Sequence, residues 1–519
     1  MNLADILEET TSQNPEKICA VQDEGGPRLT YRQVLDRTWR LVHLLRGLSV
    51  RKGDRVAVFL TNSIHYLEIY FSLARIGAIV VGMNFRLKGE EAAYILNHCQ
   101  AKVLILEERY LPLFAPLRLS IPHLFHYLVL GASAEKMLNY EEMLNQAPPA
   151  RPGREEMDEQ ETIGIMYTSG TTGLPKGVEF SHKAIAVTFD YPSAIRPGII
   201  LVNVPFYHIA GALNIYTVVY KNSTLVIIAQ FDAAKALRLM EKEGVTETYL
   251  VPTMLRALLD HPDFSGRELS SLKRIRYGAA PMPPDLILRA IRVLPCDYFN
   301  AFGQTETSGT AIALNEEDHR LVEKEEEMAK KMKRLSGIGR PIPEIECRLA
   351  DEQGKEVPPG IVGEILVRGP KLMKGYWNAP QETALVLKDG WLHTGDMAWR
   401  DEDGYLFLAD RKKDVINRGG EKIFPAEVES IINRHPKVLE SAVIGVFDPY
   451  WGEKVEAFVV LQPGISASEE EMIDFCRSRL ASYKKPALIK FLPELPKNAV
   501  GKVLKYVLRQ QASQGGPSK

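Results

Sequence analysis

Hydroxyls, glycines and one lysine are concentrated in the segment Tyr167–Val178, which reads YTSGTTGLPKGV. An apolar run, Ile163–Tyr167, leads into it, so the sequence predicts a strand that opens into a Ser/Thr/Gly loop. The backbone N–H groups and hydroxyls of such a loop suit a polyanion such as the phosphates of a nucleotide. A polar surface turn is the alternative, because the same residue types dominate turns.

The P-loop pattern GxxxxGK[ST] does not fit this segment. Counting from Gly170, the residue before Lys176 is Pro175, and Gly177 follows where Ser or Thr is required. Proline has no N–H to offer a phosphate. If the loop binds phosphate, it does so through a different architecture.

The length and composition of the chain narrow the class of protein. At 519 residues the chain exceeds the size of a single hydrophobic core, so we expect at least two domains. With 45% hydrophobic and 25% charged residues the composition is that of a globular protein. The formal net charge of -2 gives no electrostatic case for a nucleic-acid partner.

Cysteine usage and the most apolar segments indicate a cytoplasmic protein. The five cysteines are far apart and form no CxxC pair, which is typical of reduced thiols. The start MNLADILEETT lacks the pattern of a signal peptide. The most apolar stretch, 198–220, contains polar residues that are costly in a lipid-spanning helix, so we expect a buried core segment and no transmembrane segment.

Short apolar strands alternate with amphipathic helical patterns over the first three hundred residues, which predicts an α/β fold with parallel sheets. A dense charge run, Glu316–Arg334, predicts a solvated helix. From Ile345 the pattern changes to short strands and Gly/Pro turns, which favours a β-rich subdomain. After Asp410 a compact α+β unit follows. We therefore divide the chain into domains 1–410 and 411–519.

Three further motifs each have an ordinary alternative when taken alone. Thr305 and Glu306 follow a predicted strand and could hold a divalent cation through oxygen ligands. Asp396, in WLHTGD, could bind ribose hydroxyls or simply cap a helix. Lys502, in PKNAVGKVLK, would usually be a surface lysine.

The ordered set of motifs resembles the AMP-forming acyl-CoA synthetases of the adenylate-forming superfamily, which also includes peptide-synthetase adenylation domains and luciferases. The matching motifs span nearly the whole chain in the family's order. They are the phosphate loop 167–178, PFYHIAG at 205–211, GAAP at 278–281, FGQTE at 302–306, TGD at 394–396, the hinge region 410–429 and PKNAVGK at 496–502.

The resemblance implies a large N-terminal domain, containing parallel-sheet subdomains and a β-rich subdomain, and a small mobile α+β C-terminal domain with its hinge near Lys413. It also implies two reaction steps. The substrate carboxylate attacks the α-phosphorus of ATP to give an acyl-adenylate and pyrophosphate, and coenzyme A then attacks the carbonyl to give acyl-CoA and AMP.

Site roles follow from the same resemblance. Lys502 would stabilise the charge that develops between carboxylate and α-phosphate, His208 would lie near the acyl carboxylate, and Glu306 with Thr168 would hold Mg²⁺. A core position is the alternative for His208. The residues assigned to ATP and coenzyme A are Thr168, Ser169, Gly170, Thr171, Thr172, Lys176, Gly278, Ala279, Ala280, Phe302, Gly303, Thr305, Asp396, Arg411, Lys413, Gly419, Gly420 and Glu421.

The acid itself is less well defined. Candidate acyl-binding segments are 206–214, 278–280 and 303–310, and none of them contains an Asp or Arg that could pair a charged tail. We therefore expect an apolar acyl chain, first a medium- to long-chain fatty acid and second an aromatic or alicyclic acid. Asn417 and Lys422 stand where long-chain members often carry Lys and Trp, which weakens a long-chain assignment.

Two other functions stay open at this point. One is a stand-alone adenylation enzyme that loads a carrier-protein thiol. The other is a non-catalytic nucleotide-binding protein, against which the joint presence of Lys502, Glu306 and Asp396 argues. The expected partners are the acid, ATP and coenzyme A, and a homodimer is one oligomeric state that the sequence leaves open.

Overall fold

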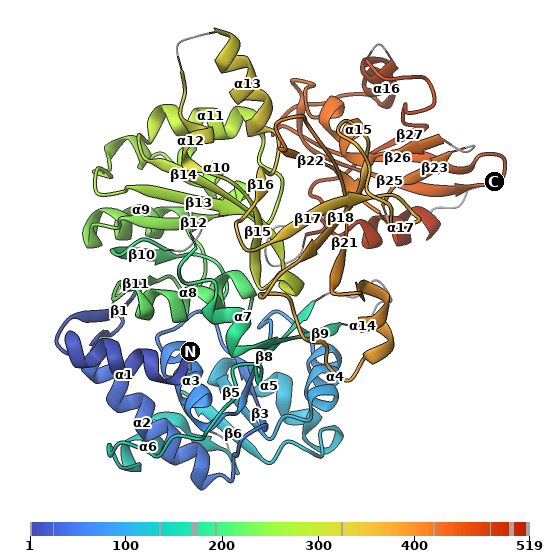
Figure 1. The fold of residues 1–519 in the computed structure, drawn as a ribbon. Helices are drawn as coiled ribbons and strands as arrows, with labels where there is room; N and C mark the ends of the chain where they lie inside the picture. Colours follow the sequence, from blue (N-terminus) through green and yellow to red (C-terminus); the bar gives the residue numbers. More distant parts are fainter. Residues whose placement is uncertain are drawn as a thin grey trace. The chain divides into compact units, whose positions relative to one another are not determined.

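The computed structural model describes ten stretches of the chain, drawn in Figure 1. These residues group into two compact units, 1–346 with 368–392 and 347–367 with 393–519. The β-rich segment therefore falls largely in the same unit as the C-terminal segment, and the division at residue 410 stays a prediction. The described stretches are 3–23, 25–133, 136–168, 175–191, 195–322, 325–412, 414–418, 421–477, 479–497 and 503–514.

The first unit contains a nine-stranded sheet whose strands β10 to β14 run parallel, as the alternating pattern predicted. In spatial order its strands are β16 (Arg340–Pro341), β15 (Gly309–Leu314), β14 (Asp297–Gln304), β13 (Arg274–Gly278), β12 (Glu247–Leu250), β10 (Ile199–Val202), β11 (Thr224–Ile227), β1 (Ile18–Gln22) and β2 (Arg28–Thr30).

Helices cover both faces of this sheet (Figure 1). Because side chains alternate along a strand, Ile275 and Tyr277 pack into the core formed with α9 (Ala233–Glu243), α10 (Pro252–Leu259) and α11 (Pro284–Val293). Arg276, between them, turns to the opposite face and contacts α8 (Ile209–Tyr220).

The first unit also contains an eight-stranded sheet, in which β8 and β9 form an antiparallel hairpin and β3 to β6 run parallel. Its strands, in spatial order, are β19 (Gly375–Tyr376), β9 (Lys176–Ser181), β8 (Thr162–Thr168), β4 (Ile79–Gly82), β3 (Arg55–Phe59), β5 (Val103–Glu107), β6 (His126–Leu130) and β7 (Leu138–Asn139). The other α-helices of this unit include α1 (Leu3–Gln13), α2 (Tyr31–Gly47), α3 (His65–Ile76), α4 (Gly89–Cys99), α5 (Leu111–Phe114), α6 (Tyr140–Gln146), α7 (His182–Ala186) and α14 (Pro380–Val386).

The second unit contains two smaller sheets. The first has the order β17 (Glu346–Ala350), β18 (Gly363–Arg368), β21 (Trp391–Arg400) and β20 (Leu387–Lys388), with β22 (Leu406–Arg411) paired to β21; parts of it belong to the first unit. The second has the order β24 (Glu421–Ile423), β23 (Ile416–Arg418), β26 (Gly452–Leu461) and β25 (Val438–Asp448), with β27 (Leu488–Phe491) paired to β26.

Helices pack against the second of these sheets. Val428, Ile432 and Met472 contribute to one core, while Leu508 belongs to another beneath the same sheet. The mixed α/β architecture with a small C-terminal α+β part confirms the predicted fold class. The helices concerned are α15 (Pro425–Ile432), α16 (Glu469–Arg477) and α17 (Lys505–Gln514).

Two local predictions differ from the structure. The charge run forms two helices, α12 (Glu316–His319) and α13 (Glu325–Leu335), where one solvated helix was expected. The prediction of a solvated face is wrong at the start of the charge run, because Asp318 and His319 are buried and His319 contacts the hydroxyl of Tyr277.

The stretch 198–220 forms β10 and α8 and is mostly buried, as expected. Across the described stretches, no helix combines the length and apolar character needed to cross a membrane.

Candidate active site

The phosphate-loop segment is held by the hairpin of β8 and β9. Thr168, the last residue of β8, pairs with Lys176, the first residue of β9. Ser169, Gly170, Thr171 and Thr172 lie between them, outside the described residues. One residue before Thr168, the Tyr167 hydroxyl and Nδ1 of His98 lie 2.7 Å apart. Strand pairing therefore places Thr168 and Lys176 on either side of the predicted phosphate loop.

Glu306 and Lys176, which are 130 positions apart in the chain, meet at the side chain of Tyr376. The Tyr376 hydroxyl donates a hydrogen bond to Oε1 of Glu306 over 3.0 Å. Nζ of Lys176 lies 5.1 Å from the centre of the Tyr376 ring, which is a cation–π contact. The backbone adds a second link, since the N–H of Met373 donates to the carbonyl oxygen of Glu306 over 2.9 Å.

Strand pairing also places Tyr376 where it can make both contacts. Tyr376 belongs to β19 and pairs with Val178 of β9, two residues beyond Lys176. Its own N–H donates to the Thr383 hydroxyl over 2.8 Å. Burial and the neighbouring Glu306 raise the pKa of Tyr376, so its hydroxyl stays protonated and able to donate. Tyr376 was not predictable from the sequence, because only the fold brings its short strand beside the hairpin.

The predicted adenine-binding residues lie at the ends of β13 and β14. Gly278 pairs with Ala301, the residue before Phe302, so the two predicted motifs are neighbours across the sheet. A Cβ on Gly278 would stand 2.1 Å from the carbonyl oxygen of Ala301, so only glycine fits there. The next residue, Ala279, adopts a left-handed φ of 65°, which is uncommon for a residue with a side chain.

The turn that carries Thr305 and Glu306 is tightly packed. A Cβ on Gly303 would stand 2.0 Å from the carbonyl oxygen of Gly309, so β14 and β15 approach closely here. The Thr307 hydroxyl donates to the same Gly309 carbonyl over 2.6 Å. These contacts fix the short 3₁₀ turn Thr305–Thr307 and therefore the position of Glu306.

His208 occupies the N-cap position of α8. Burial lowers its pKa to about 4, so the imidazole is neutral at physiological pH. The neighbouring Tyr207 ring lies 4.7 Å from it. A neutral imidazole at this position can donate or accept a hydrogen bond, but it does not supply a positive charge to a substrate carboxylate.

Two of the candidate acyl-binding segments meet at α8. The Leu213 side chain lies 2.7 Å from where a Cβ on Gly309 would stand. Asn214 accepts a hydrogen bond over 2.8 Å from Arg276, two residues before Gly278. The structure therefore brings the segments 206–214 and 303–310 together at Leu213, and it places Arg276, which lies in none of the three segments, against Asn214.

The second unit holds the remaining predicted residues. Asp396 is buried on β21 and pairs across the sheet with Arg411 of β22. The N–H of Asp396 donates to the Thr394 hydroxyl over 3.1 Å, and that hydroxyl donates to the carbonyl oxygen of Ile365 over 2.8 Å. Glu421 begins β24 and is exposed. Lys413, Gly419, Gly420 and Lys502 lie outside the described residues.

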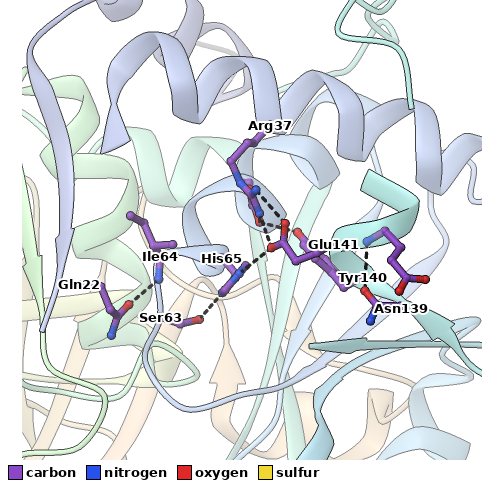
Figure 2. A network of polar contacts seen from close by, with 10 residues as sticks. Gln22, Arg37, Ser63, Ile64, His65, Asn139, Tyr140 and Glu141 are labelled. Atoms are coloured by element: carbon purple, nitrogen blue, oxygen red, sulfur yellow. Dashed lines mark hydrogen bonds and ion pairs between the residues drawn. The ribbon is translucent and has the colours of Figure 1, made fainter. Parts of the chain in front are cut away.

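A separate cluster of metal-ligating side chains lies among α2, α3 and α6 (Figure 2). Ligand atoms of His65, Glu68 and Glu141 lie within 4.8 Å of one another. The Arg37 guanidinium donates to both carboxylates, with Nη2 3.0 Å from Glu68 and 2.7 Å from Glu141. Hydrogen bonding to His65 and the charge of Arg37 lower the pKa of Glu141 to about 2. Because Arg37 already supplies the positive charge, we read this cluster as an ion-pair network that joins three helices.

Glycine-containing motifs at the carboxyl ends of parallel strands, such as the one at Gly278, are typical of ligand-binding α/β enzymes. The chain belongs to the AMP-binding enzyme family, which matches residues 7–377, and the family's C-terminal domain matches residues 427–502. The resemblance found in the sequence is thereby confirmed, and the protein is an AMP-forming acid–thiol ligase of the acyl-CoA synthetase type.

Relatives of this chain act on different acids. The fatty acid–[acyl-carrier-protein] ligase ScoC of Streptomyces coeruleorubidus is 34% identical over 94% of this chain and 92% of its own length. A feruloyl-CoA synthase of Amycolatopsis sp is 36% identical over 94% of each chain. The crystal structure of the anthranilate CoA ligase AuaEII in complex with anthranoyl-AMP has a TM-score of 0.90 at 29% identity, covering 99% of this chain and 98% of that one.

Proposed function

We propose that the protein activates a carboxylic acid with ATP and Mg²⁺, forms an acyl-adenylate, and transfers the acyl group to coenzyme A. The observation that carries this proposal is the meeting of Lys176 and Glu306 at Tyr376, beside the hairpin that bears the phosphate loop. A cation and a carboxylate at one edge of that hairpin suit the phosphates of ATP and the metal ion that accompanies them.

The donor set fits Mg²⁺, because Glu306 and Thr168 offer the hard oxygen ligands that this ion prefers. Bound there, Mg²⁺ would neutralise charge on the phosphate oxygens of ATP. Lys176 would contribute a fixed positive charge beside the same phosphates. Gly278, Ala279, Ala280 and Phe302 would hold the adenine, and Asp396 with Arg411 the ribose.

Lys502 is proposed to act at the reacting phosphorus. A carboxylate and a triphosphate repel each other, and the transition state of the first step concentrates negative charge between them. A lysine placed there stabilises that charge more than it stabilises the ground state. Rotation about the proposed hinge at Lys413 would withdraw Lys502 before coenzyme A attacks the carbonyl. Different residues would then surround the reacting carbonyl in the two steps.

The identity of the acid is the part of the proposal that the structure changes most. The preference for an apolar chain rested on the absence of Arg and Asp from the three acyl-binding segments. Arg276, which lies outside these segments, contacts Asn214 of one segment, so a polar group also borders the predicted acyl site. A fatty acid keeps support from the Streptomyces relative, while the feruloyl and anthranilate relatives support an aromatic acid.

A second candidate function is the loading of a carrier-protein thiol, which the name of the Streptomyces relative favours. The first step is the same in both candidates. Exchange of labelled pyrophosphate into ATP, measured with a panel of acids, tests that step. Supplying free coenzyme A or a phosphopantetheinylated carrier protein then separates the two acceptors. A homodimer and a cytoplasmic location stay predictions from the sequence.

A further inference from the structure

A polar cluster lies between α8 and the strands β12 and β13. Arg276 of β13 donates from Nη2 to Oδ1 of Asn214 over 2.8 Å and from Nε to Oε1 of Glu247 over 2.6 Å. Its guanidinium lies 5.7 Å from the centre of the Tyr249 ring, which is directly across the sheet in register. Four side chains from three elements therefore form one contact network below α8.

The charges of this cluster are balanced within the protein. Glu247, almost fully buried, pairs with Arg276, and the buried Arg274 pairs with Glu316 over 2.9 Å. Each guanidinium already has a carboxylate beside it. An anionic group of a ligand would add an unmatched charge in a desolvated place, which is costly. The cluster therefore suits an uncharged ligand group.

One hydroxyl in the cluster has no partner. Tyr249 is 7% exposed, and no residue of the described stretches forms a hydrogen bond with its hydroxyl. The hydroxyl does not belong to the fully buried polar atoms that lack a partner, so it is accessible from outside and a ligand group can pair with it. Burial raises the pKa of Tyr249 to about 12, with Arg276 opposing the shift, so the hydroxyl is protonated and able to donate.

Gly278 leaves space beside that hydroxyl. A Cβ on Gly278 would stand 2.8 Å from the Tyr249 oxygen, so any larger residue would crowd it. Gly278 belongs to a candidate acyl-binding segment, and Asn214 belongs to another. Gly278 is also the last residue of β13, and ligands of open α/β sheets bind at the carboxyl ends of the strands.

The position of Asn214 along α8 sets the distance between the polar cluster and the proposed site of the acyl carboxylate. His208, proposed to lie near the acyl carboxylate, caps the helix, and Asn214 follows six residues later. At 1.5 Å per residue this is about 9 Å along the helix axis. A polar group that reaches the cluster would therefore be remote from the carboxyl group of the acid.

We propose that Tyr249 and Arg276 recognise an uncharged hydrogen-bonding substituent, such as a hydroxyl or carbonyl group, at the end of the acid remote from its carboxyl group. The inference rests on the proposed acid-activating function and narrows its substrate class. Unsubstituted fatty acids are then the poorer substrates, and hydroxylated aryl or alkyl acids the better ones.

Matched acids test this inference. Pyrophosphate exchange would be measured with cinnamic, 4-hydroxycinnamic and 4-carboxycinnamic acid, and with octanoic and 8-hydroxyoctanoic acid. We expect at least one hydroxylated acid to exceed its parent in kcat/KM by about tenfold, because one hydrogen bond to the Tyr249 hydroxyl is gained. The carboxylated acid should be no better than cinnamic acid.

Tyr249→Phe supplies the matching change in the protein. It removes only an unpartnered hydroxyl, so the melting temperature should not fall, and the preference for the hydroxylated acid should drop to about twofold or less. Tyr298→Phe is the control. Tyr298 lies in the core between the same sheet and α9 to α11, and its hydroxyl donates to the carbonyl oxygen of Leu294. That variant should keep the wild-type preference. If Tyr249→Phe does not fold, Arg276→Lys gives the second test. Lysine retains the positive charge beside Glu247 but lacks the guanidinium N–H groups that reach Asn214, so the preference for the hydroxylated acid should also fall.

The outcomes separate the inference from the function. If octanoic and cinnamic acid are both activated as well as their hydroxylated partners, or if Tyr249→Phe leaves the preference unchanged, the inference is overturned and the function stands. If no acid of any class supports exchange, the proposed function fails and the inference with it.

Discussion

The hydroxyl of Tyr376 donates to Oε1 of Glu306 over 3.0 Å, which links a short strand beside the phosphate-loop hairpin to the carboxylate predicted to hold Mg²⁺. A single side chain therefore orients this carboxylate, while the face of its ring attracts Lys176. Tyr376 therefore contacts both Lys176, proposed to bind the ATP phosphates, and Glu306, proposed to bind the metal ion.

Tyr376→Phe should raise the Mg²⁺ concentration for half-maximal activity by about tenfold, because a hydrogen bond to a charged group is lost while the ring remains beside Lys176. Tyr376→Leu should also raise the KM for ATP, since the ring is lost. Binding of Mn²⁺ with a non-hydrolysable ATP analogue, followed by electron paramagnetic resonance, gives a readout independent of turnover. Equal Mn²⁺ affinity in wild type and Tyr376→Phe would show that the hydroxyl does not orient the metal site.

Lys502→Ala should reduce adenylate formation by at least about a hundredfold, as expected for the loss of a charge that stabilises a transition state. Attack of coenzyme A on a supplied acyl-adenylate should continue at close to the wild-type rate. Single-turnover assays of the two half-reactions measure this division. Equal losses in both steps would contradict it.

Gly303→Ala should destabilise the protein by about 2 kcal/mol or more, because its Cβ would meet the Gly309 carbonyl oxygen at 2.0 Å. Gly266→Ala is the matched control, since a Cβ there meets nothing within 4 Å. Urea denaturation of both variants gives the comparison. A Gly303→Ala protein as stable as the Gly266→Ala protein would mean that β14 and β15 are not held so closely.

His319 should make the protein less stable as the pH falls below 6.5. Burial lowers its pKa to about 4, while the Tyr277 hydroxyl and the Asn315 carbonyl oxygen lie 2.8 Å from its two ring nitrogens. Above pH 6.5 both folded and unfolded chains carry a neutral imidazole, so there is no penalty. Between pH 6.5 and 4 the unfolded chain takes up a proton that the folded chain does not, which lowers the free energy of unfolding.

For this one group the loss between pH 7 and pH 5 is about 2 kcal/mol. His319→Gln should be less stable at pH 7, because it does not reproduce both contacts of the imidazole. Its stability should fall less between the two pH values than that of the wild type. Urea denaturation at both pH values measures the difference, and identical slopes would exclude His319 as the cause.

The fold was largely predictable from the sequence, because its strands are short apolar runs between amphipathic helices. The parallel order of β10 to β14 follows from that alternation. The start of the charge run was not predictable, since the burial of His319 depends on Tyr277, 42 positions away in the chain.

The site was predictable only where function is carried by contiguous motifs, such as the segment around Glu306. Tyr376 and Arg276 lie outside these motifs. Tyr376 acquires its position from strand pairing with β9, and Arg276 from the side alternation of β13 beneath α8. Such positions depend on tertiary contacts, which a single sequence does not display.

The central claim is that this chain activates a carboxylic acid by forming an acyl-adenylate. Acid-dependent exchange of labelled pyrophosphate into ATP, measured with Mg²⁺ and the aryl and alkyl acids above, tests it most directly. We predict exchange with at least one hydroxylated acid in the absence of coenzyme A, and formation of equal amounts of acyl-CoA and AMP when coenzyme A is added. A folded, ATP-binding protein that shows no exchange with any acid would contradict the claim.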